Sequence, residues 1–287
     1  MQQTPRPSPS RAIDPTIVAG VIEIVRRAGD AILEIYNSDF AVEHKADASP
    51  LTQADLAAHH IIADGLAALD PATPLLSEES RPPDFAVRRH WSRYWLVDPL
   101  DGTKEFVNRN GEFTVNIALI ENHRPSFGVV GVPVRGLVYT GDVLRGLAQR
   151  IGPAGTEPLH GRPMVDARPL VVVASRSHGG ARLETYLDAL KRIYPGVDRT
   201  PVGSSLKLCI LAEGQADLYP RLGPTSEWDI AAAHAVLAAA GGSVWAVDGS
   251  ALEYNRKAEL LNPEFIAVAD GIYPWRDRLP PVPPAGD

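Results

Sequence analysis

The sequence predicts an α/β fold built from two sub-domains. The N-terminal part has the apolar periodicity of helices, the middle consists of short apolar runs rich in β-branched residues, and the second half alternates between strand and helix patterns. With 287 residues, the chain is long enough for one large domain or for two sub-domains with a substantial core.

Two helices should begin the fold. Residues 14–36 carry apolar side chains at helical spacing, with Asp14 as the N-cap and Pro15 at the first helical position. A second helix should run over residues 52–69 and end at Asp70-Pro71. Four short apolar runs then predict an antiparallel sheet: 94–97, 113–120, 126–132 and 137–140.

The second half should contain a strand–helix–strand pattern. Residues 145–169 hold several Gly and Pro residues, so they are expected to be irregular and to contain the sub-domain boundary. The expected strands are 170–174, 216–219, 244–247 and 265–269. The expected helices are 181–194, 204–213 and 227–240, the last ending at Gly241-Gly242.

These elements predict four parts of the chain. They are a tail over 1–13, an N-terminal α+β sub-domain over 14–150, a C-terminal α/β sub-domain over 151–272 and a proline-rich tail over 273–287. Both tails should be disordered or loosely extended, because they are rich in proline.

The composition is ordinary for a soluble globular protein, with 45% hydrophobic and 22% charged residues. A formal net charge of −7 argues against a broad electrostatic grip on nucleic acid. Cys209 is the single cysteine, so no intrachain disulfide is possible, and we expect it to be buried. The N-terminus lacks the apolar core of a signal peptide, and no run of roughly 18 apolar residues could span a membrane. These features predict a cytoplasmic enzyme.

The most informative segment is residues 95–106, WLVDPLDGTKEF. A strand should lead into a turn at which Asp98 and Asp101, three residues apart, face one point with the Leu100 carbonyl. Hard divalent cations prefer such an all-oxygen set. The amides of Gly102-Thr103 at the start of a short helix would provide an anion site beside these metal ligands.

Two other segments add carboxylates. Ser77-Glu78-Glu79-Ser80 follows an apolar run where a strand should end, and Asp229 lies in the first turn of a helix. Each acidic segment also has a purely structural interpretation, as an Asp-Pro turn, a solvated loop or a helix cap favoured by the helix dipole. Zinc is not expected, because His59-His60 and His234 have no partner at ligand spacing.

These motifs carry a family resemblance. Residues 95–106 and 227–242 (EWDIAAAHAVLAAAGG) are similar to the two signatures of the inositol monophosphatase superfamily, and 45–55 (KADASPLTQAD) to a third, although Leu51 stands where the family often has Val. The resemblance covers roughly residues 14–270 and is closest to the CysQ-type 3′(2′),5′-bisphosphate nucleotidases. It implies a layered αβαβα sandwich of the inositol monophosphatase and fructose-1,6-bisphosphatase type, with the active site between two sub-domains.

The same resemblance implies roles for individual residues. Two magnesium ions would be held by Glu78, Asp98, the Leu100 carbonyl, Asp101 and Asp229. Lithium would inhibit the enzyme by competing for a magnesium position. The implied reaction is in-line attack on phosphorus by a metal-bound water. Glu78 would orient this water, Thr103 tied to Asp55 would help to activate it, and Asp47 would lie near a third metal position.

Three later segments resemble nucleotidases rather than inositol phosphatases: 175–178 (SRSH), 203–207 (GSSLK) and 219–228 (YPRLGPTSEW). The expected substrate contacts are Gly102, Thr103, Ser175, His178, Ser204, Ser205, Lys207, Arg221 and Asp229. Ser204, Ser205, Lys207 and Arg221 could hold a second, uncleaved phosphate. The alternatives are a helix cap for Ser204 and a surface loop for His178.

The predicted function is therefore hydrolysis of adenosine 3′,5′-bisphosphate to AMP and phosphate in sulfate assimilation, with phosphoadenylyl sulfate as a second substrate. One alternative is a broader phosphatase of the same superfamily that acts on inositol 1-phosphate or fructose 1,6-bisphosphate. The other is a non-catalytic nucleotide-binding protein, which the complete set of metal carboxylates argues against. No nucleic acid polymer is expected as a partner, the chain should be a monomer or homodimer, and the inner face of the membrane is the alternative location.

Overall fold

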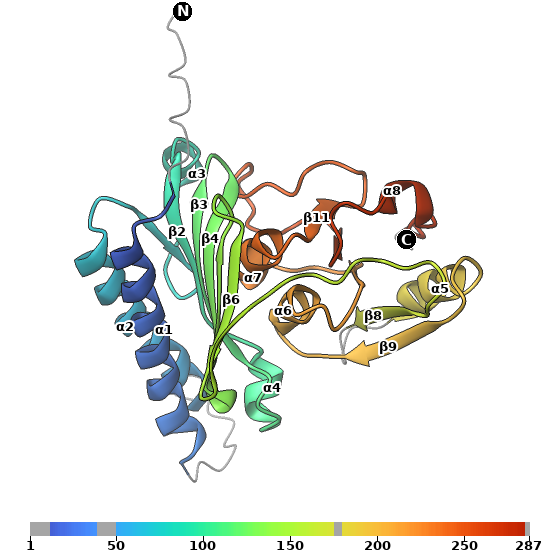
Figure 1. The fold of residues 1–287 in the computed structure, drawn as a ribbon. Coiled ribbons are helices and arrows are strands. Elements are labelled where there is room, and N and C mark those ends of the chain that lie inside the picture. Colours follow the sequence, from blue (N-terminus) through green and yellow to red (C-terminus); the bar gives the residue numbers. More distant parts are fainter. Residues whose placement is uncertain (1–11, 39–49, 175–179, 285–287) are drawn as a thin grey trace, which may run out of the picture.

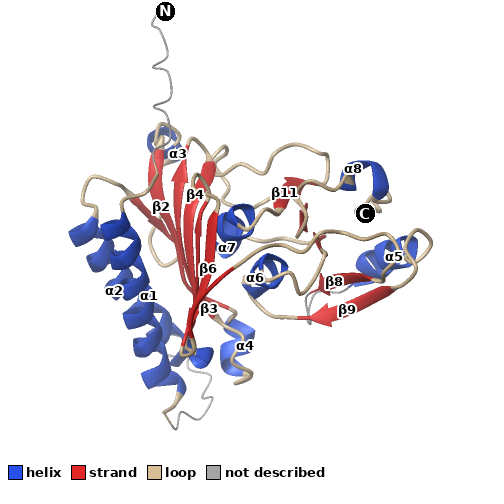
Figure 2. Ribbon diagram, in the orientation of Figure 1, coloured by secondary structure: helices blue, strands red, loops and turns tan. Residues whose placement is uncertain are grey.

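The computed structural model describes residues 12–38, 50–174 and 180–284. Its elements stack in five layers, which are a helix pair, a seven-stranded sheet, two central helices, a five-stranded sheet and outer helices (Figures 1 and 2). This arrangement confirms the predicted αβαβα sandwich. None of the helices in the described ranges is long and apolar enough to cross a membrane.

The first layer consists of α1 (Pro15–Tyr36) and α2 (Pro50–Leu69), and both predicted helices are confirmed. Asp14 caps α1 as expected, since its Oδ1 accepts a hydrogen bond from the Thr16 amide at 2.8 Å. The helices cross closely, because a Cβ on Gly65 would lie 2.7 Å from the Ile24 side chain.

The seven-stranded sheet has the order β1 to β7. Its strands are β1 (Leu75–Ser77), β2 (Arg93–Asp101), β3 (Thr114–Glu121), β4 (Arg124–Val132), β5 (Leu137–Asp142), β6 (Leu147–Gly152) and β7 (Gly155–Pro158). β1 pairs parallel with β2, and every other pair is antiparallel, as predicted. The expectation that 145–169 is irregular was wrong for 147–158, where β6 and β7 form a hairpin, whereas 159–169 contains no helix or strand. This hairpin lies at the edge of the sheet and β7 is fully exposed, so it lacks the apolar alternation that marks a strand.

The five-stranded sheet has the order β11–β12–β10–β8–β9. Its strands are β8 (Leu170–Ala174), β9 (Val197–Pro201), β10 (Leu218–Arg221), β11 (Ser243–Ala246) and β12 (Phe265–Val268). Only β9 was not predicted. It is an edge strand with mostly exposed residues. The outer helices α5 (Gly180–Leu190) and α8 (Trp275–Arg278) pack on one face of this sheet.

The central layer consists of α6 (Leu206–Ala212) and α7 (Glu227–Ala239), which share a core with both sheets. Glycines in the seven-stranded sheet allow the alanine-rich α7 to approach its backbone. A Cβ on Gly128 would lie 2.2 Å from the Ala232 carbonyl oxygen, and one on Gly141 would lie 2.5 Å from the Val236 Cα. This close packing fixes the N-terminus of α7 beside β2. The remaining short helices are α3 (Phe85–Arg88), η1 (Pro133–Arg135) and α4 (Thr103–Val107).

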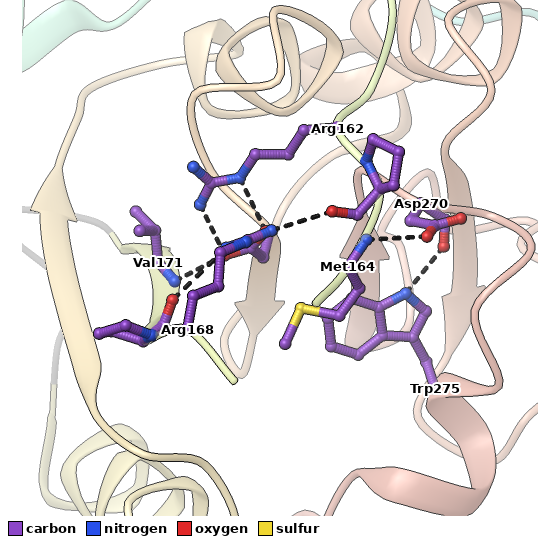
Figure 3. A network of polar contacts seen from close by, with 9 residues as sticks. Arg162, Met164, Arg168, Val171, Asp270 and Trp275 are labelled. Atoms are coloured by element: carbon purple, nitrogen blue, oxygen red, sulfur yellow. Dashed lines mark hydrogen bonds and ion pairs between the residues drawn. The ribbon is translucent and has the colours of Figure 1, made fainter. Parts of the chain in front are cut away.

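The connection between the sheets is fixed by polar contacts around Asp217 (Figure 3). Arg162 and Arg168 each donate two hydrogen bonds to its carboxylate, and the Val171 amide donates a fifth, at distances between 2.6 and 2.8 Å. Farther along, the predicted tail over 273–287 is not loosely extended at its start, because it contains α8, whose Trp275 is buried. Arg182 also anchors it by donating a hydrogen bond to the Pro283 carbonyl. The predicted N-terminal tail lies mostly outside the described residues, although Ile13 is buried.

Candidate active site

A cavity of about 310 Å³ opens where the end of β2 meets β10 and the first turns of α6 and α7. Its lining combines acidic, basic and hydroxyl side chains. The predicted site residues on its wall are Glu78, Asp98, Leu100, Asp101, Gly102, Thr103, Ser204, Ser205, Lys207, Arg221 and Asp229. Segments far apart in the sequence therefore form one polar site.

Three elements bring the carboxylates together. Asp98 and Asp101 flank an irregularity near the end of β2, where the pairing with β3 shifts. Ser77, at the end of β1, pairs with Val97, so Glu78 follows beside Asp98. The first turn of α7 contributes Asp229. One carboxylate oxygen from each of Glu78, Asp98 and Asp229 lies within 4.8 Å of the others.

Backbone amides orient three of these carboxylates. The Leu100 amide donates to Asp98 Oδ1 at 3.0 Å, and the Ser205 amide donates to Asp101 Oδ2 at 2.6 Å. The Ser226 amide donates to Asp229 Oδ2 at 2.9 Å as part of a capping box at the start of α7. The helix cap and the proposed metal ligand are thus the same side chain, so the two sequence interpretations of Asp229 are compatible.

The acidic groups raise one another's pKa. Burial, followed by the charges of Asp101, Glu78 and Asp229, raises the pKa of Asp98 well above its ordinary value. Burial is also the largest cause for the others, with a pKa of about 7 for Asp101, about 6 for Asp229 and about 8 for Asp55. The oxygen-only donors and their negative charge, which nearby cations offset only in part, fit a hard divalent cation. Such a cation would relieve the repulsion.

Two cations, Lys207 and Arg221, also line the cavity. Lys207 is buried, and its Nζ donates a hydrogen bond to the Ser204 carbonyl at 2.7 Å. Burial lowers its pKa to about 8, against the opposing effect of Asp101. The Arg221 guanidinium donates to the carbonyls of Gly223 and Pro224. Neither cation forms an ion pair with a carboxylate within the part of the chain that the structure describes.

Ser204 and Ser205, which also line the cavity, differ in the hydrogen bonding of their hydroxyls. Among the described residues, the Ser204 hydroxyl is buried without a hydrogen-bond partner, and its backbone has a φ of 45°. The N-cap of α6 is Ser205, so the expected alternative of a helix cap for Ser204 does not hold. The Ser205 hydroxyl instead contacts Thr114 Oγ1 at 2.9 Å and donates to Asn116 Oδ1 at 2.8 Å. Ser205 therefore ties the start of α6 to β3.

Other residues of the expected site are placed less directly. Asp47, Ser175 and His178 lie outside the described residues. Thr103 is exposed on the cavity wall, and the hydrogen bonds within 12–38, 50–174 and 180–284 include none between it and Asp55, so that link stays a prediction. Gly102, with a φ of 100°, is the N-cap of α4.

The cavity wall also includes side chains that sequence reasoning did not assign, namely Lys104, Glu105, Leu208, Tyr219, Thr225, Ser226 and Ile230. Five of these seven fall inside the segments 95–106 and 219–228, so the motifs indicated most of the right regions. Only the fold shows which side chains in those segments reach the cavity.

Comparison with known proteins agrees with this geometry. The model of the inositol monophosphatase family matches residues 15–274. The 3′(2′),5′-bisphosphate nucleotidase CysQ of Escherichia coli strain K12 is 51% identical over 250 residues, covering 85% of this chain and 96% of the relative. The crystal structure of CysQ from Bacteroides thetaiotaomicron has a TM-score of 0.79 at 43% identity, over 88% of this chain and 96% of that one. Inositol monophosphatase II from Staphylococcus aureus, at 19% identity and a TM-score of 0.74 over 92% and 93% of the two chains, shares the fold.

Proposed function

Because this chain belongs to the inositol monophosphatase family, we propose that it removes the 3′-phosphate from adenosine 3′,5′-bisphosphate. As a member of this family related to CysQ nucleotidases, it is a phosphatase. The observation that carries the proposal is one cavity lined both by a carboxylate cluster and by the cations Lys207 and Arg221. The cluster suits a metal-bound scissile phosphate, and the cations suit a second phosphate that is not cleaved.

The proposed cofactor is magnesium, bound in two positions, with a third position near Asp47. Lithium would compete with magnesium for one of these positions. Glu78, Asp98, Asp101, Asp229 and the Leu100 carbonyl would hold the ions, which fit the oxygen-only donors of the cavity. Bound magnesium supplies charge neutralisation at the phosphate and lowers the pKa of a coordinated water.

The residues of the chain then have separate tasks. Glu78 orients the attacking water, since its carboxylate lies beside those of Asp98 and Asp229. Thr103 and Asp55 assist at the same water. Hydrogen bonds from backbone amides hold the carboxylates of Asp98, Asp101 and Asp229 in place before substrate arrives.

Substrate specificity depends on the serine and the two cations that line the cavity. The free hydroxyl of Ser204 and the cations Lys207 and Arg221 bind the remaining phosphate of the nucleotide. Phosphoadenylyl sulfate carries the same 3′-phosphate, so we propose it as a second substrate. The cytoplasm stays our prediction for the location, and a monomer or homodimer for the assembly.

The test is phosphate release with magnesium from adenosine 3′,5′-bisphosphate, phosphoadenylyl sulfate, inositol 1-phosphate and fructose 1,6-bisphosphate, each with and without lithium. We expect kcat/KM for the bisphosphate to exceed that for the two non-nucleotides by about a hundredfold, or about 2.7 kcal/mol of transition-state preference. Comparable rates on all substrates would contradict the nucleotide assignment and would favour a general phosphatase of the family.

A further inference from the structure

The four carboxylates of the site are not held in the same way. Asp98, Asp101 and Asp229 each accept a hydrogen bond from a backbone amide. Within the described ranges, no backbone amide donates to the carboxylate of Glu78, which is also the most exposed of the four. Its own amide donates to the Val97 carbonyl at 3.1 Å. The position of the Glu78 carboxylate therefore depends on its side-chain contacts with Asp98 and Trp228 and on the turn from which it projects.

That turn is short and closed. It spans residues 77–80, directly after β1, and the Ser80 amide donates to the Ser77 carbonyl at 3.2 Å. Ser77 is 1% exposed, so its hydroxyl needs a partner within the protein. Both serine hydroxyls lie at the ends of the turn, on either side of Glu78.

One imidazole contacts both hydroxyls. Nδ1 of His59 lies 3.0 Å from Ser77 Oγ, and its Nε2 lies 3.4 Å from Ser80 Oγ. His59 is half-buried on α2, one helical turn after Asp55. The ring thus connects the first layer of the fold to both ends of the turn that carries Glu78.

The chemistry of the ring suits this bridge. Burial, with the neighbouring His60, lowers the pKa of His59, which favours a neutral ring at neutral pH. A neutral imidazole has one donor and one acceptor nitrogen, and a hydroxyl can take either role. Both ring nitrogens can therefore be satisfied by the two serines at once.

We propose that His59 is a positioning residue that braces the 77–80 turn and so holds Glu78 against Asp98 and Asp229. The inference rests on the proposed function only in that this cluster binds the catalytic cation. Within the described ranges, His59 does not line the cavity, and its side-chain hydrogen bonds go to Ser77 and Ser80 rather than to a proposed metal ligand. His59 fixes the position of the Glu78 carboxylate indirectly, through the turn, whereas backbone amides fix the other three carboxylates directly.

The test compares His59→Phe, which keeps the ring and removes its hydrogen bonds, with His59→Gln, which keeps a donor and an acceptor. His60→Phe is the matched control, because His60 is the exposed neighbour on the same helix. Two quantities are measured, the Mg²⁺ concentration that half-maximally stabilises the substrate-free protein against heat, and kcat and KM at each Mg²⁺ concentration. Magnesium is used alone as the probe of the site in the first measurement.

For His59→Phe we expect the Mg²⁺ midpoint to rise about tenfold and kcat to fall about tenfold, with KM for the bisphosphate unchanged. His59→Gln should recover most of both, and His60→Phe should match the wild type. The changes that His59→Phe and Ser77→Ala cause in the Mg²⁺ midpoint and in kcat should be non-additive in the double variant, since the two residues share one contact.

Two results would overturn the proposal. One is a Mg²⁺ midpoint for His59→Phe equal to that of His60→Phe. The other is a loss of heat stability that is equal with and without Mg²⁺ and is not rescued by His59→Gln, since this would show a packing role only. Equal wild-type rates on nucleotide and non-nucleotide substrates would instead refute the proposed function, and the Mg²⁺ midpoints would still decide the role of His59.

Discussion

Asp217 and Asp98 are both 1% exposed, yet their surroundings are opposite. Burial alone would raise the pKa of Asp217, but hydrogen bonds from Arg168, Arg162 and a backbone amide outweigh it and lower the pKa (Figure 3). Asp98 is surrounded by other carboxylates, and burial together with their charges raises its pKa.

The difference separates a structural acid from a functional one. A buried charge is costly unless it is paired, and Asp217 is paired by two arginines from the connection between the sheets. The chain supplies the cluster around Asp98 with no such ion pair among the described residues. Lys207 and Arg221 offset the charge of this cluster only in part, and such a site fits one that receives cations from solution.

The largest effect should come from Asp101→Asn. The amide keeps an acceptor for the Ser205 backbone but loses the charge that a divalent cation needs. We expect kcat to fall by at least about a thousandfold, which is about 4 kcal/mol. The metal-free variant should be at least as stable as the wild type, because one repulsive charge is gone. Phosphate release and urea unfolding with EDTA check both points, and a near wild-type rate would contradict the metal assignment.

The reverse result is expected for Asp217→Asn. Loss of its charge leaves Arg162 and Arg168 without their partner, so stability should fall by about 3–5 kcal/mol. Below the unfolding transition, kcat/KM should stay within about twofold of the wild type, because Asp217 lies outside the cavity. Urea unfolding gives the first quantity.

Asp188→Asn is the matched control for Asp217→Asn, since its pair with Lys191 is exposed and should contribute nothing measurable. If Asp217→Asn does not fold, Arg162→Ala tests the same cluster with one arginine left in place. A stable Asp217 variant with reduced activity would reverse the two roles.

The pH dependence of stability should also separate the two kinds of acid. Asp229, Asp101 and Asp55 have folded-state pKa values of about 6, 7 and 8, above their ordinary value of 3.8. The folded state then binds more protons than the unfolded state between pH 4 and 8, so metal-free stability falls as pH rises through this window. The slope should be at least about 1.4 kcal/mol per pH unit near pH 6 to 7.

Urea midpoints at pH 5, 6, 7 and 8, with EDTA or with saturating Mg²⁺, measure this dependence. Magnesium should remove most of the loss, since cation binding favours the deprotonated carboxylates. Asp217 acts in the opposite direction, because its lowered pKa contributes stability that is lost as pH falls below its ordinary range. Metal-free stability that is flat or rises from pH 5 to 8 would contradict the description of the acidic cluster.

Local patterns account for what the sequence could predict. The long helices α1 and α2 follow from apolar periodicity, and the turn at Asp98 and Asp101 follows from a compact motif. The hairpin of β6 and β7 was missed because β7 is an exposed edge strand and β6 is mostly half-buried, so neither shows apolar alternation.

Contacts between distant segments could not be predicted in this way. Asp217 lies 55 residues from Arg162 and 49 from Arg168, and neither arginine belongs to a motif. Ser205 was expected to bind phosphate, but its hydroxyl contacts β3, 89 and 91 residues away. The role of His59 likewise appears only once α2 is packed beside the end of β1.

The smallest effect tests whether the arginine in the cavity differs from the two on Asp217. Arg221 donates to the carbonyls of Gly223 and Pro224 rather than to a carboxylate, so its charge is available to a substrate anion. Arg221→Ala should raise KM for adenosine 3′,5′-bisphosphate about tenfold, or about 1.4 kcal/mol, and change KM for a monophosphate substrate much less. Arg221→Lys, which keeps the charge but loses the planar donor pair, should be intermediate. Equal effects on both substrates would show that Arg221 only stabilises the loop at Gly223 and Pro224. The second phosphate would then need another partner in the cavity.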